Sequence, residues 1–328
     1  MKKTSCFLGG IILIVTALMI TGCAQKAAAQ GLPARPIAQA GTAGAAKVYM
    51  TADISPAGLA AVYNALGRTA SGKVAVKIST GEPGGHNFLQ PALIGPFVKA
   101  VNGTIVESNT AYGGRRASTA MHYQVAKDHG FTAIAPVVIL DENGDIPLPV
   151  SGGTHLKQDY VGAHFKDYDF HVVLSHFKGH AMGGFGGALK NMSIGYGSSR
   201  GKAWIHSAGK SFTNPWGGAQ NAFLESMAEA AKAVSDASGG RILYISVMNR
   251  LSVDCDCSSN PAEPDMHDIG ILASLDPVAL DKACVDLVYA APDGRSLIQR
   301  IESRNGALTM THAAKIGLGS LEYELVKL

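Results

Sequence analysis

The chain has 328 residues, of which 47% are hydrophobic and 16% are charged. These proportions exclude global disorder, because disordered chains are poor in apolar residues and rich in charge. The formal net charge is only +3, which leaves no electrostatic footprint for nucleic acid, so we expect no nucleic-acid partner. Glycine is enriched, at 39 of 328 residues or about 12% against an average of roughly 7%, and it clusters between residues 179 and 218.

The N-terminal residues have the features of an export signal. Lys2 and Lys3 precede an apolar stretch from Phe7 to Ile20, which is too short to span a bilayer of roughly 30 Å comfortably as a helix. The stretch ends in the run Ile20-Thr-Gly-Cys23, which resembles the lipobox of bacterial lipoproteins. The resemblance implies cleavage before Cys23, lipidation of that cysteine, and a protein exported and held by lipid on the outer face of a bacterial membrane. A plain secretory signal or a single anchor helix is the alternative.

We therefore expect a lipoprotein signal peptide at 1–22, a flexible tether at 23–46 and a single α/β domain at 47–328. The tether is rich in Ala, Gln, Gly and Pro and has few large apolar residues, as flexible linkers do. Processing removes Cys6 and leaves Cys255, Cys257 and Cys284 beside the lipidated residue. Three thiols are an odd number for an exported protein, which argues against a disulfide framework and favours a metal, a cluster or one redox pair.

Apolar and β-branched runs predict the strands. They occur at 73–78, 104–107, 133–140, 171–175, 241–247 and 269–273. Near-continuous apolar strands are typical of a sheet covered on both faces. Helices are expected at 56–69, 91–101, 118–129, 220–235 and 277–289, of which the first and last begin with Ser55-Pro56 and Asp276-Pro277. The alternation predicts an α/β fold with a mainly parallel sheet, helices on both faces and glycine-rich strand-to-helix loops.

Functional sites in open α/β sheets lie at the carboxyl ends of strands, and three such junctions are rich in polar residues. The first combines residues 79–87 with residues 109–116, which follow two successive predicted strands. Arg115 and Arg116 in this junction could clamp a carboxylate or phosphate of a small anionic ligand. Turn-forming residues beside surface arginines explain the same stretch equally well.

The second junction, residues 175–191, follows the strand at 171–175 directly. We predict catalytic roles for His176, His180 and Lys190, because imidazole transfers protons and lysine supplies positive charge. The two histidines are four residues apart, which would place them on one face of a helix. Glycine amides can approach a ligand closely. Anion binding is assigned to Lys178, Gly183, Gly184, Gly186, Gly187 and Asn191. Close helix–strand packing with two ordinary histidines is the alternative.

The third junction contains the run Asp254-Cys255-Asp256-Cys257, with His267 further along. Two thiols one residue apart can bind one soft metal ion, and His267 could be a third ligand. The two aspartates disfavour the thiolate form unless a bound cation compensates them, which favours a metal over a thiol-exchange centre. We therefore predict a metal ion or iron–sulfur cluster at Cys255, Cys257 and His267. A solvent-exposed loop or a labile disulfide is the alternative.

Two long motifs resemble the family catalogued as domain of unknown function 362. Residues 175–195 (SHFKGHAMGGFGGALKNMSIG) resemble its lysine, histidine and glycine signature, and residues 269–288 (IGILASLDPVALDKACVDLV) resemble its second signature. The resemblance extends over roughly 48–328, and members of that family are commonly labelled iron–sulfur cluster-binding. It implies an uncharacterised protein that binds a metal ion or cluster and has a redox or small-molecule role.

Two other functions stay open. The pattern from His180 to Lys190 is loosely similar to nickel-dependent lactate racemases, which implies an enzyme that acts on a small hydroxy acid with paired histidines as acid and base. A third interpretation is a lipid-tethered protein that binds a small anionic solute without chemistry. Turnover would distinguish the enzyme from this binding protein.

Overall fold

The computed structural model describes Met1 and residues 44–328. The predicted signal peptide, Cys23 and nearly all of the predicted tether lie outside the described residues, so they stay predictions. The last residue of that tether, Ala46, is already the first residue of a strand. Within the described part of the chain, no helix is both long and apolar enough to cross a membrane.

The described residues form one large sheet of eight strands. These are β1 (Ala46–Thr51), β2 (Val74–Lys77), β3 (Gly103–Glu107), β4 (Val137–Ile139), β7 (Phe170–His176), β10 (Ile242–Met248), β11 (Gly270–Ser274) and β12 (Tyr323–Lys327). Their order across the sheet is β12-β1-β11-β10-β7-β2-β3-β4. Strand β11 is antiparallel to both of its neighbours, and all other adjacent pairs are parallel. The predicted α/β fold with a mainly parallel sheet is confirmed.

Helices connect and cover these strands. They are α1 (Pro56–Ala65), α2 (Pro91–Ala100), α3 (Thr119–Asp128), α4 (Ala188–Tyr196), α5 (Ser199–His206), α6 (Gln220–Ala237), α7 (Pro277–Ala290), α8 (Arg295–Ser303) and α9 (Ala307–Lys315). Two small hairpins complete the described part: β5 (Asp145–Pro149) with β6 (Gln158–Gly162), and β8 (Lys178–His180) with β9 (Gly184–Gly186).

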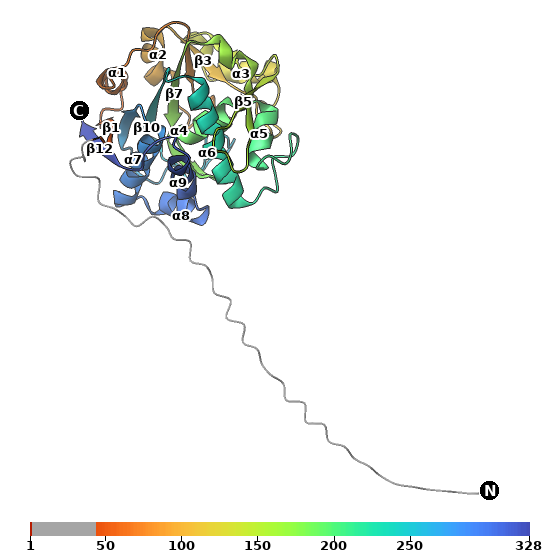
Figure 1. The fold of residues 1–328 in the computed structure, drawn as a ribbon. Helices are drawn as coiled ribbons and strands as arrows, with labels where there is room; N and C mark the ends of the chain where they lie inside the picture. Colours follow the sequence, from red (N-terminus) through yellow and green to blue (C-terminus); the bar gives the residue numbers. More distant parts are fainter. Residues whose placement is uncertain (2–43) are drawn as a thin grey trace. The chain divides into compact units, whose positions relative to one another are not determined.

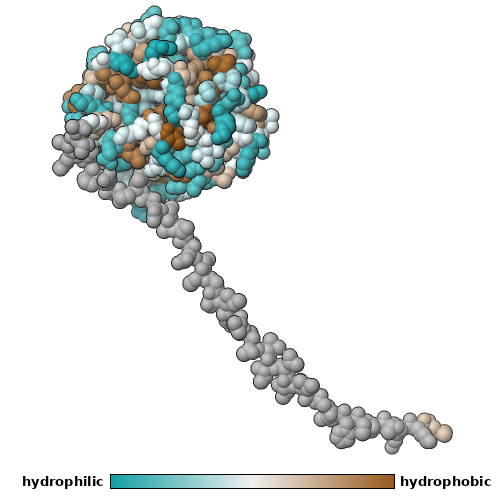
Figure 2. Space-filling model, in the orientation of Figure 1, coloured by the Kyte–Doolittle hydropathy of each residue, from teal (hydrophilic) through white to brown (hydrophobic). Residues whose placement is uncertain are grey.

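The sheet has an apolar core on each face, because successive side chains of a strand point to opposite sides. Val74 and Val76 of β2 belong to the core under α1 and α2. Ala75 between them belongs to the core under α4, α6, α7 and α9. Figure 1 shows the second set of helices lying over the near face of the sheet. On the surface seen in Figure 2, hydrophobic residues form separate patches between hydrophilic ones.

Helix α1 begins where the sequence predicts and ends earlier. The Ser55 hydroxyl accepts hydrogen bonds from the backbone N–H groups of Ala57 and Gly58, both at 3.2 Å, as an N-cap does. The helix ends at Ala65 instead of Thr69 because Gly67 has a φ of 61°, a left-handed conformation that ends helices.

The strand predicted at 133–140 is shorter than expected. Residues Phe131–Ala133 form a 3-10 turn, and β4 begins only at Val137. The residue before the strand is Pro136, which has no N–H to donate to a neighbouring strand.

The order of the strands creates a crevice at the carboxyl ends of β2 and β7. From β2 the sheet extends through β3 to β4 on one side, whereas β7 lies on the other side and is followed by β10. Ligands of open α/β sheets bind at such a change of direction. The candidate site is therefore expected between β2 and β7.

Candidate functional site

A cavity of about 310 Å³ opens at this crevice. Its walls come from the ends of β2, β3 and β7, from α4 and α5, and from the loop after β10. The charged, histidine and cysteine residues that line it are Lys77, Glu107, Arg116, His176, Lys178, His180, Lys190, Lys202, His206, Cys255, Asp256 and Cys257. Five of these side chains are basic and two are carboxylates, so the cavity has an excess of positive charge and suits an anion.

Lys77 and Glu107 form a buried ion pair at the ends of β2 and β3, with 2.8 Å between Nζ and Oε1. Burial alone would raise the pKa of Glu107, but Lys77 and Arg116 lower it to about 2. Asn191 of α4 completes the group, because its Oδ1 accepts from Lys77 Nζ at 3.1 Å and its Nδ2 donates to the Lys77 carbonyl at 3.1 Å. Asn191 thus ties α4 to the sheet, a structural role in place of the predicted anion contact.

The two predicted arginines separate in the structure. Arg116 is buried and lines the cavity, where its Nε atom lies 2.8 Å from Glu82 and an Nη atom lies 3.6 Å from Glu107. Arg115 does not line the cavity and forms an exposed pair with Asp128 at 3.3 Å. The prediction that both arginines face one pocket is therefore wrong for Arg115, because the turn that buries one guanidinium points the next to solvent.

His176 and His180 do not share a helix face, because β7 ends at His176 and β8 spans Lys178–His180. The Nδ1 atom of His176 lies 2.9 Å from Asp256 Oδ1, and its Nε2 lies 2.7 Å from the Asn249 carbonyl. Both ring nitrogens thus face acceptor oxygens of the protein, so neither nitrogen is left for a substrate. The geometry supports a positioning role for His176 instead of the predicted catalytic one.

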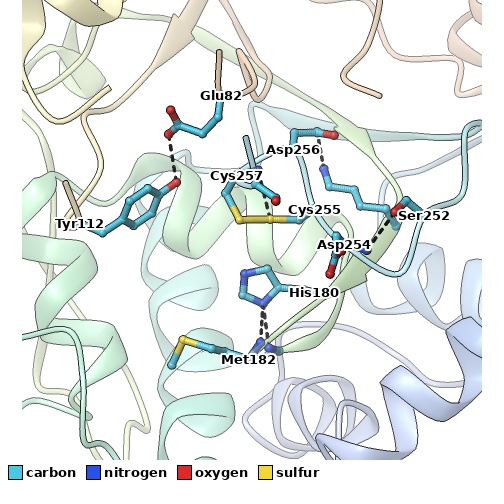
Figure 3. Close-up of a disulfide and its surroundings, with 12 residues drawn as sticks. Glu82, Tyr112, His180, Met182, Ser252, Asp254, Cys255, Asp256 and Cys257 are labelled. Atoms are coloured by element: carbon cyan, nitrogen blue, oxygen red, sulfur yellow. Dashed lines mark hydrogen bonds and ion pairs between the residues drawn. A yellow bond between two sulfur atoms is a disulfide. The ribbon is translucent and has the colours of Figure 1, made fainter. Parts of the chain in front are cut away.

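His180 keeps one ring nitrogen toward the cavity. Its Nδ1 accepts hydrogen bonds from the backbone N–H groups of Gly183 at 2.8 Å and Met182 at 3.3 Å. In the neutral ring the proton is therefore on Nε2, which faces the disulfide in Figure 3. Burial, followed by the positive charge of Lys190, lowers the pKa of His180 well below its usual value. The ring is neutral at neutral pH and offers one N–H group to the cavity.

Lys190 lines the cavity without a counter-ion among the described residues. Among the described residues, no carboxylate lies within 4.0 Å of its amino group, and α4 presents it to the cavity. A Cβ atom built on Gly186 would lie 3.2 Å from Lys190 Cδ and 3.8 Å from Lys178 Cε, so the two lysines pass close to the same glycine. Burial, followed by the charge of Lys178, lowers the pKa of Lys190 to about 7.

The predicted glycines have different roles. Gly186 and Gly187 line the cavity, whereas Gly183 and Gly184 do not. A Cβ atom on Gly184 would lie 3.1 Å from the Ile301 carbonyl of α8, so this glycine allows close packing. The amides at the start of α4 are taken by Asp281, which accepts from the N–H groups of Ala188 and Leu189 at 2.7 and 2.9 Å. The N–H groups of Ala188 and Leu189 are thus not free for an anion, whereas anion binding at Gly186 and Gly187 stays a prediction.

Cys255 and Cys257 are joined in a disulfide on the cavity wall (Figure 3). The aspartates around them are compensated by protein cations. Asp256 lies 2.7 Å from Lys178 Nζ as well as 2.9 Å from His176, and Asp254 lies 3.1 Å from Arg300 Nη1. The expectation that uncompensated carboxylates call for a metal ion here is therefore wrong.

The donor atoms nearest to one another at this wall belong to His180, Cys255 and Cys257, and all of them lie within 4.8 Å. His267 is not part of this group: its Nδ1 lies 2.7 Å from Asp293 on the surface, which corrects the prediction of a ligand. Cys284 is a free thiol buried in α7. The three donors do not fit a cluster, which takes four ligands. They match a single soft ion only when the disulfide is reduced.

Several lining residues were not predicted as functional. Lys202 of α5 donates to the Gly197 carbonyl at 2.7 Å, and burial lowers its pKa to about 8. The ring of His206 stacks on Phe223 at 4.5 Å and its buried Nδ1 has no partner within the described part of the chain. Lys77 and Glu107 also line the cavity, and the sequence contains a signal for them, because a charged residue at the end of an apolar strand is unusual. The sequence contains no such signal for Lys202 and His206 of α5.

The comparisons with known proteins identify the family. Two solved structures resemble this chain at 15% identity: the lactate racemase apoprotein from Thermoanaerobacterium thermosaccharolyticum, with a TM-score of 0.36, and a protein from Thermotoga maritima, with a TM-score of 0.41. The alignments cover 61% and 70% of this chain, and 50% and 57% of those chains, so this chain spans little more than half of their length. No curated protein matches. The family described as domain of unknown function (DUF362) matches residues 74–286, and the chain belongs to that family.

Proposed function

We propose that this protein is an enzyme that binds a small organic anion in the cationic cavity and transfers a proton to or from it with Lys190 and His180. The observation that carries the proposal is the amino group of Lys190, which faces the cavity without a carboxylate partner among the described residues. The other basic residues there are already paired or hydrogen-bonded, as Lys77 is with Glu107 and Lys178 with Asp256.

The two groups would have complementary roles. A pKa of about 7 makes Lys190 an effective base near neutral pH, because the best proton-transfer groups titrate near the working pH. His180 would donate its Nε2–H to an oxygen of the bound anion, since its Nδ1 is held by the N–H of Gly183 at 2.8 Å. Arg116 would bind a carboxylate or phosphate group of the same molecule from the β3 side of the cavity.

Proton abstraction can be measured without knowing the substrate. We would incubate the protein with separate 2-hydroxy, 2-oxo and 2-amino acids in deuterated water and follow loss of the α-proton signal by proton NMR. Lys190→Met should reduce exchange about 100-fold or more for any acid that the wild type exchanges, as expected for loss of a catalytic base. Lys210→Met, at an exposed position, is the matched control and should exchange as the wild type does.

If some of these acids bind but none exchanges its α-proton, the result would favour a binding protein that catalyses no reaction. Binding of the same acids is therefore measured by calorimetry in parallel. Absence of both binding and exchange for every acid, in protein shown to be folded, would contradict the proposal.

A metal ion is the second candidate ligand, and the proximity of His180, Cys255 and Cys257 favours it. In the reduced protein, two thiolates would hold a soft ion, and His180 would join them on losing the proton of Nε2, because metal ligands bind in the deprotonated form. The ion would act as a Lewis acid or a redox centre. Elemental analysis of protein purified anaerobically with a reductant tests this candidate. A stoichiometric metal that is lost in Cys255→Ser/Cys257→Ser would support it, and metal-free wild-type protein would contradict it.

We also propose that the mature chain is exported and tethered to the outer face of a bacterial membrane through lipid on Cys23. The basis is the leader and its lipobox-like run, which lie outside the described residues. Cys23→Ser should block processing or release the protein from membranes, and Cys6→Ser is the control that should leave both unchanged. A Cys23→Ser variant that fractionates and migrates as the wild type does would contradict the anchor.

A further inference from the structure

The Cys255–Cys257 disulfide lines the cavity but has no part in the proposed proton transfer. We propose that this pair is a redox centre that exchanges its disulfide with a small dithiol entering the cavity. The inference does not depend on the proposed substrate, because it rests on how the two sulfurs, the loop and the neighbouring cations are arranged.

The two sulfurs differ in access. Cys255 is buried, with 4% of its surface exposed, whereas Cys257 is partly exposed. Thiol–disulfide exchange needs an attacking thiolate in line with the bond that breaks, so the more accessible sulfur is attacked. The incoming thiol would therefore bond to Cys257 Sγ, and Cys255 would leave as the thiolate.

The leaving sulfur already has a hydrogen-bond donor. The backbone N–H of Cys257 points to Cys255 Sγ at 3.2 Å, and a ring nitrogen of His180 lies within 4.8 Å of both sulfurs. In Figure 3 the imidazole faces the disulfide from one side, and its other nitrogen is held by backbone N–H groups. The N–H of Cys257 and the Nε2–H of His180 would both stabilise negative charge on Cys255 as it leaves.

The neighbouring aspartates do not oppose this charge. Asp256 lies 2.7 Å from Lys178 and 2.9 Å from His176, so one carboxylate faces two basic groups. Asp254 lies 3.1 Å from Arg300. The two carboxylates are therefore offset by protein cations, so they do not disfavour a thiolate at the pair.

The loop holds both cysteines in place on either side of the bond. The Ser252 carbonyl accepts from the N–H of Gly179 at 2.8 Å, and the Val253 carbonyl accepts from Arg300 at 2.7 Å. After Cys257 the N–H of Ser258 returns to the Cys255 carbonyl at 2.9 Å. None of these contacts uses a sulfur atom, so they can persist in the reduced protein and keep the thiols close enough to rejoin.

The exchange balances in two steps. One thiolate of the dithiol attacks Cys257 Sγ, which forms a mixed disulfide and releases the Cys255 thiolate. The second thiolate of the dithiol then attacks its own sulfur in the mixed disulfide and expels the Cys257 thiolate. The dithiol becomes a cyclic disulfide, and the protein gains the two electrons and, at the pH where thiols are protonated, two protons.

The test equilibrates folded protein with mixtures of reduced and oxidised dithiothreitol in the presence of EDTA. A Cys284→Ser background removes the buried thiol of α7. Alkylation and mass spectrometry of the peptide containing both cysteines then give the fraction reduced. We expect the disulfide to be reduced completely without denaturant. The fraction reduced at each ratio of reduced to oxidised dithiothreitol should be the same whether the protein starts in the oxidised or in the reduced form.

Single variants test which sulfur is attacked. Cys255→Ser leaves the accessible thiol and should react with oxidised glutathione about tenfold faster than Cys257→Ser, because exchange depends on access. Circular dichroism verifies that both are folded.

Two results would overturn the inference. One is a disulfide that dithiothreitol reduces only after unfolding, and the other is faster reaction of Cys257→Ser than of Cys255→Ser. If the reduced thiols no longer react when EDTA is omitted, because a metal ion is bound to them, the pair belongs to the metal site instead.

Discussion

The Oδ2 atom of Asp256 lies 2.7 Å from Nζ of Lys178, and both side chains are almost completely buried. The other carboxylate oxygen faces His176 at 2.9 Å. One carboxylate thus joins the end of β7, the start of β8 and the loop that carries the disulfide. The desolvation of Asp256 favours its neutral form, but His176 and Lys178 hold its pKa far below the usual range.

Asp256→Asn should therefore destabilise the protein strongly. It leaves two buried basic groups without their counter-ion, and breaking a buried ion pair costs about 3–5 kcal/mol. Urea unfolding followed by circular dichroism measures the change in the free energy of unfolding. The matched control is Asp254→Asn in the same loop, whose partly exposed pair with Arg300 should contribute less than about 1 kcal/mol. Equal effects of the two substitutions would contradict the role given to Asp256.

The central fold was predictable because its strands are buried on both faces. The segments that became β2 and β10 are almost uninterrupted runs of apolar residues, β7 has an apolar centre, and every residue of all three is buried. The edge strand β12 and its neighbour β1 were not predicted. Both include exposed and partly exposed residues, so neither has the apolar run that marks a central strand. The antiparallel direction of β11 depends on pairing across the sheet, and no local pattern encodes it.

Arg116 and Arg115 offer a second matched comparison. Arg116→Gln removes a buried guanidinium that contacts Glu82 at 2.8 Å and lines the cavity. We expect weaker binding of a small carboxylate, by about tenfold, because a hydrogen bond between charged groups contributes about 1.5–3 kcal/mol. Arg115→Gln removes an exposed pair with Asp128 and should leave affinity unchanged. Calorimetric titration of both variants tests this, and a similar loss for Arg115→Gln would show that the arginines act together after all.

The candidate site was predictable in part. His180, Lys178 and Lys190 lie in the glycine-rich stretch that the sequence marks, and the strand order brings Arg116 and the two cysteines to the same cavity. What the sequence does not encode locally is which polar groups are already satisfied. Both nitrogens of His176 are occupied by residues more than 70 positions away, and only the folded chain reveals that pairing.

Anion binding should weaken as the pH rises through about 7. Lys190 has a pKa of about 7, so it is positively charged below this pH and neutral above it. Lys178, Asp256, Glu107 and Arg116 face it, and Lys202, whose pKa is about 8, loses its charge at the upper end of the same range. The affinity of the wild type for a small carboxylate should therefore fall between pH 6 and pH 8, roughly tenfold for the loss of one charged contact. In Lys190→Met the affinity should be lower at pH 6 and should fall less over the same range, because only the partial loss of charge on Lys202 remains. A wild-type affinity that rises with pH would contradict the role of the charged Lys190 in binding the anion.

Gly179 fixes the position of the disulfide loop. A Cβ atom on this residue would lie 2.2 Å from the Val253 carbonyl oxygen and 2.6 Å from its Cα atom, so the backbone of the loop would have to move. Gly179→Ala should destabilise the protein by about 1–3 kcal/mol, as overpacking of a closely packed site does, and it should change the rate at which dithiothreitol reduces the disulfide. Gly113→Ala is the control, because a Cβ atom there would meet no atom within 4 Å. Unfolding in urea and thiol titration report the two effects separately. A Gly179→Ala variant with wild-type stability would show that the loop can move away from β8 at little cost. The contacts of the loop could then not be what keeps the two cysteines close together.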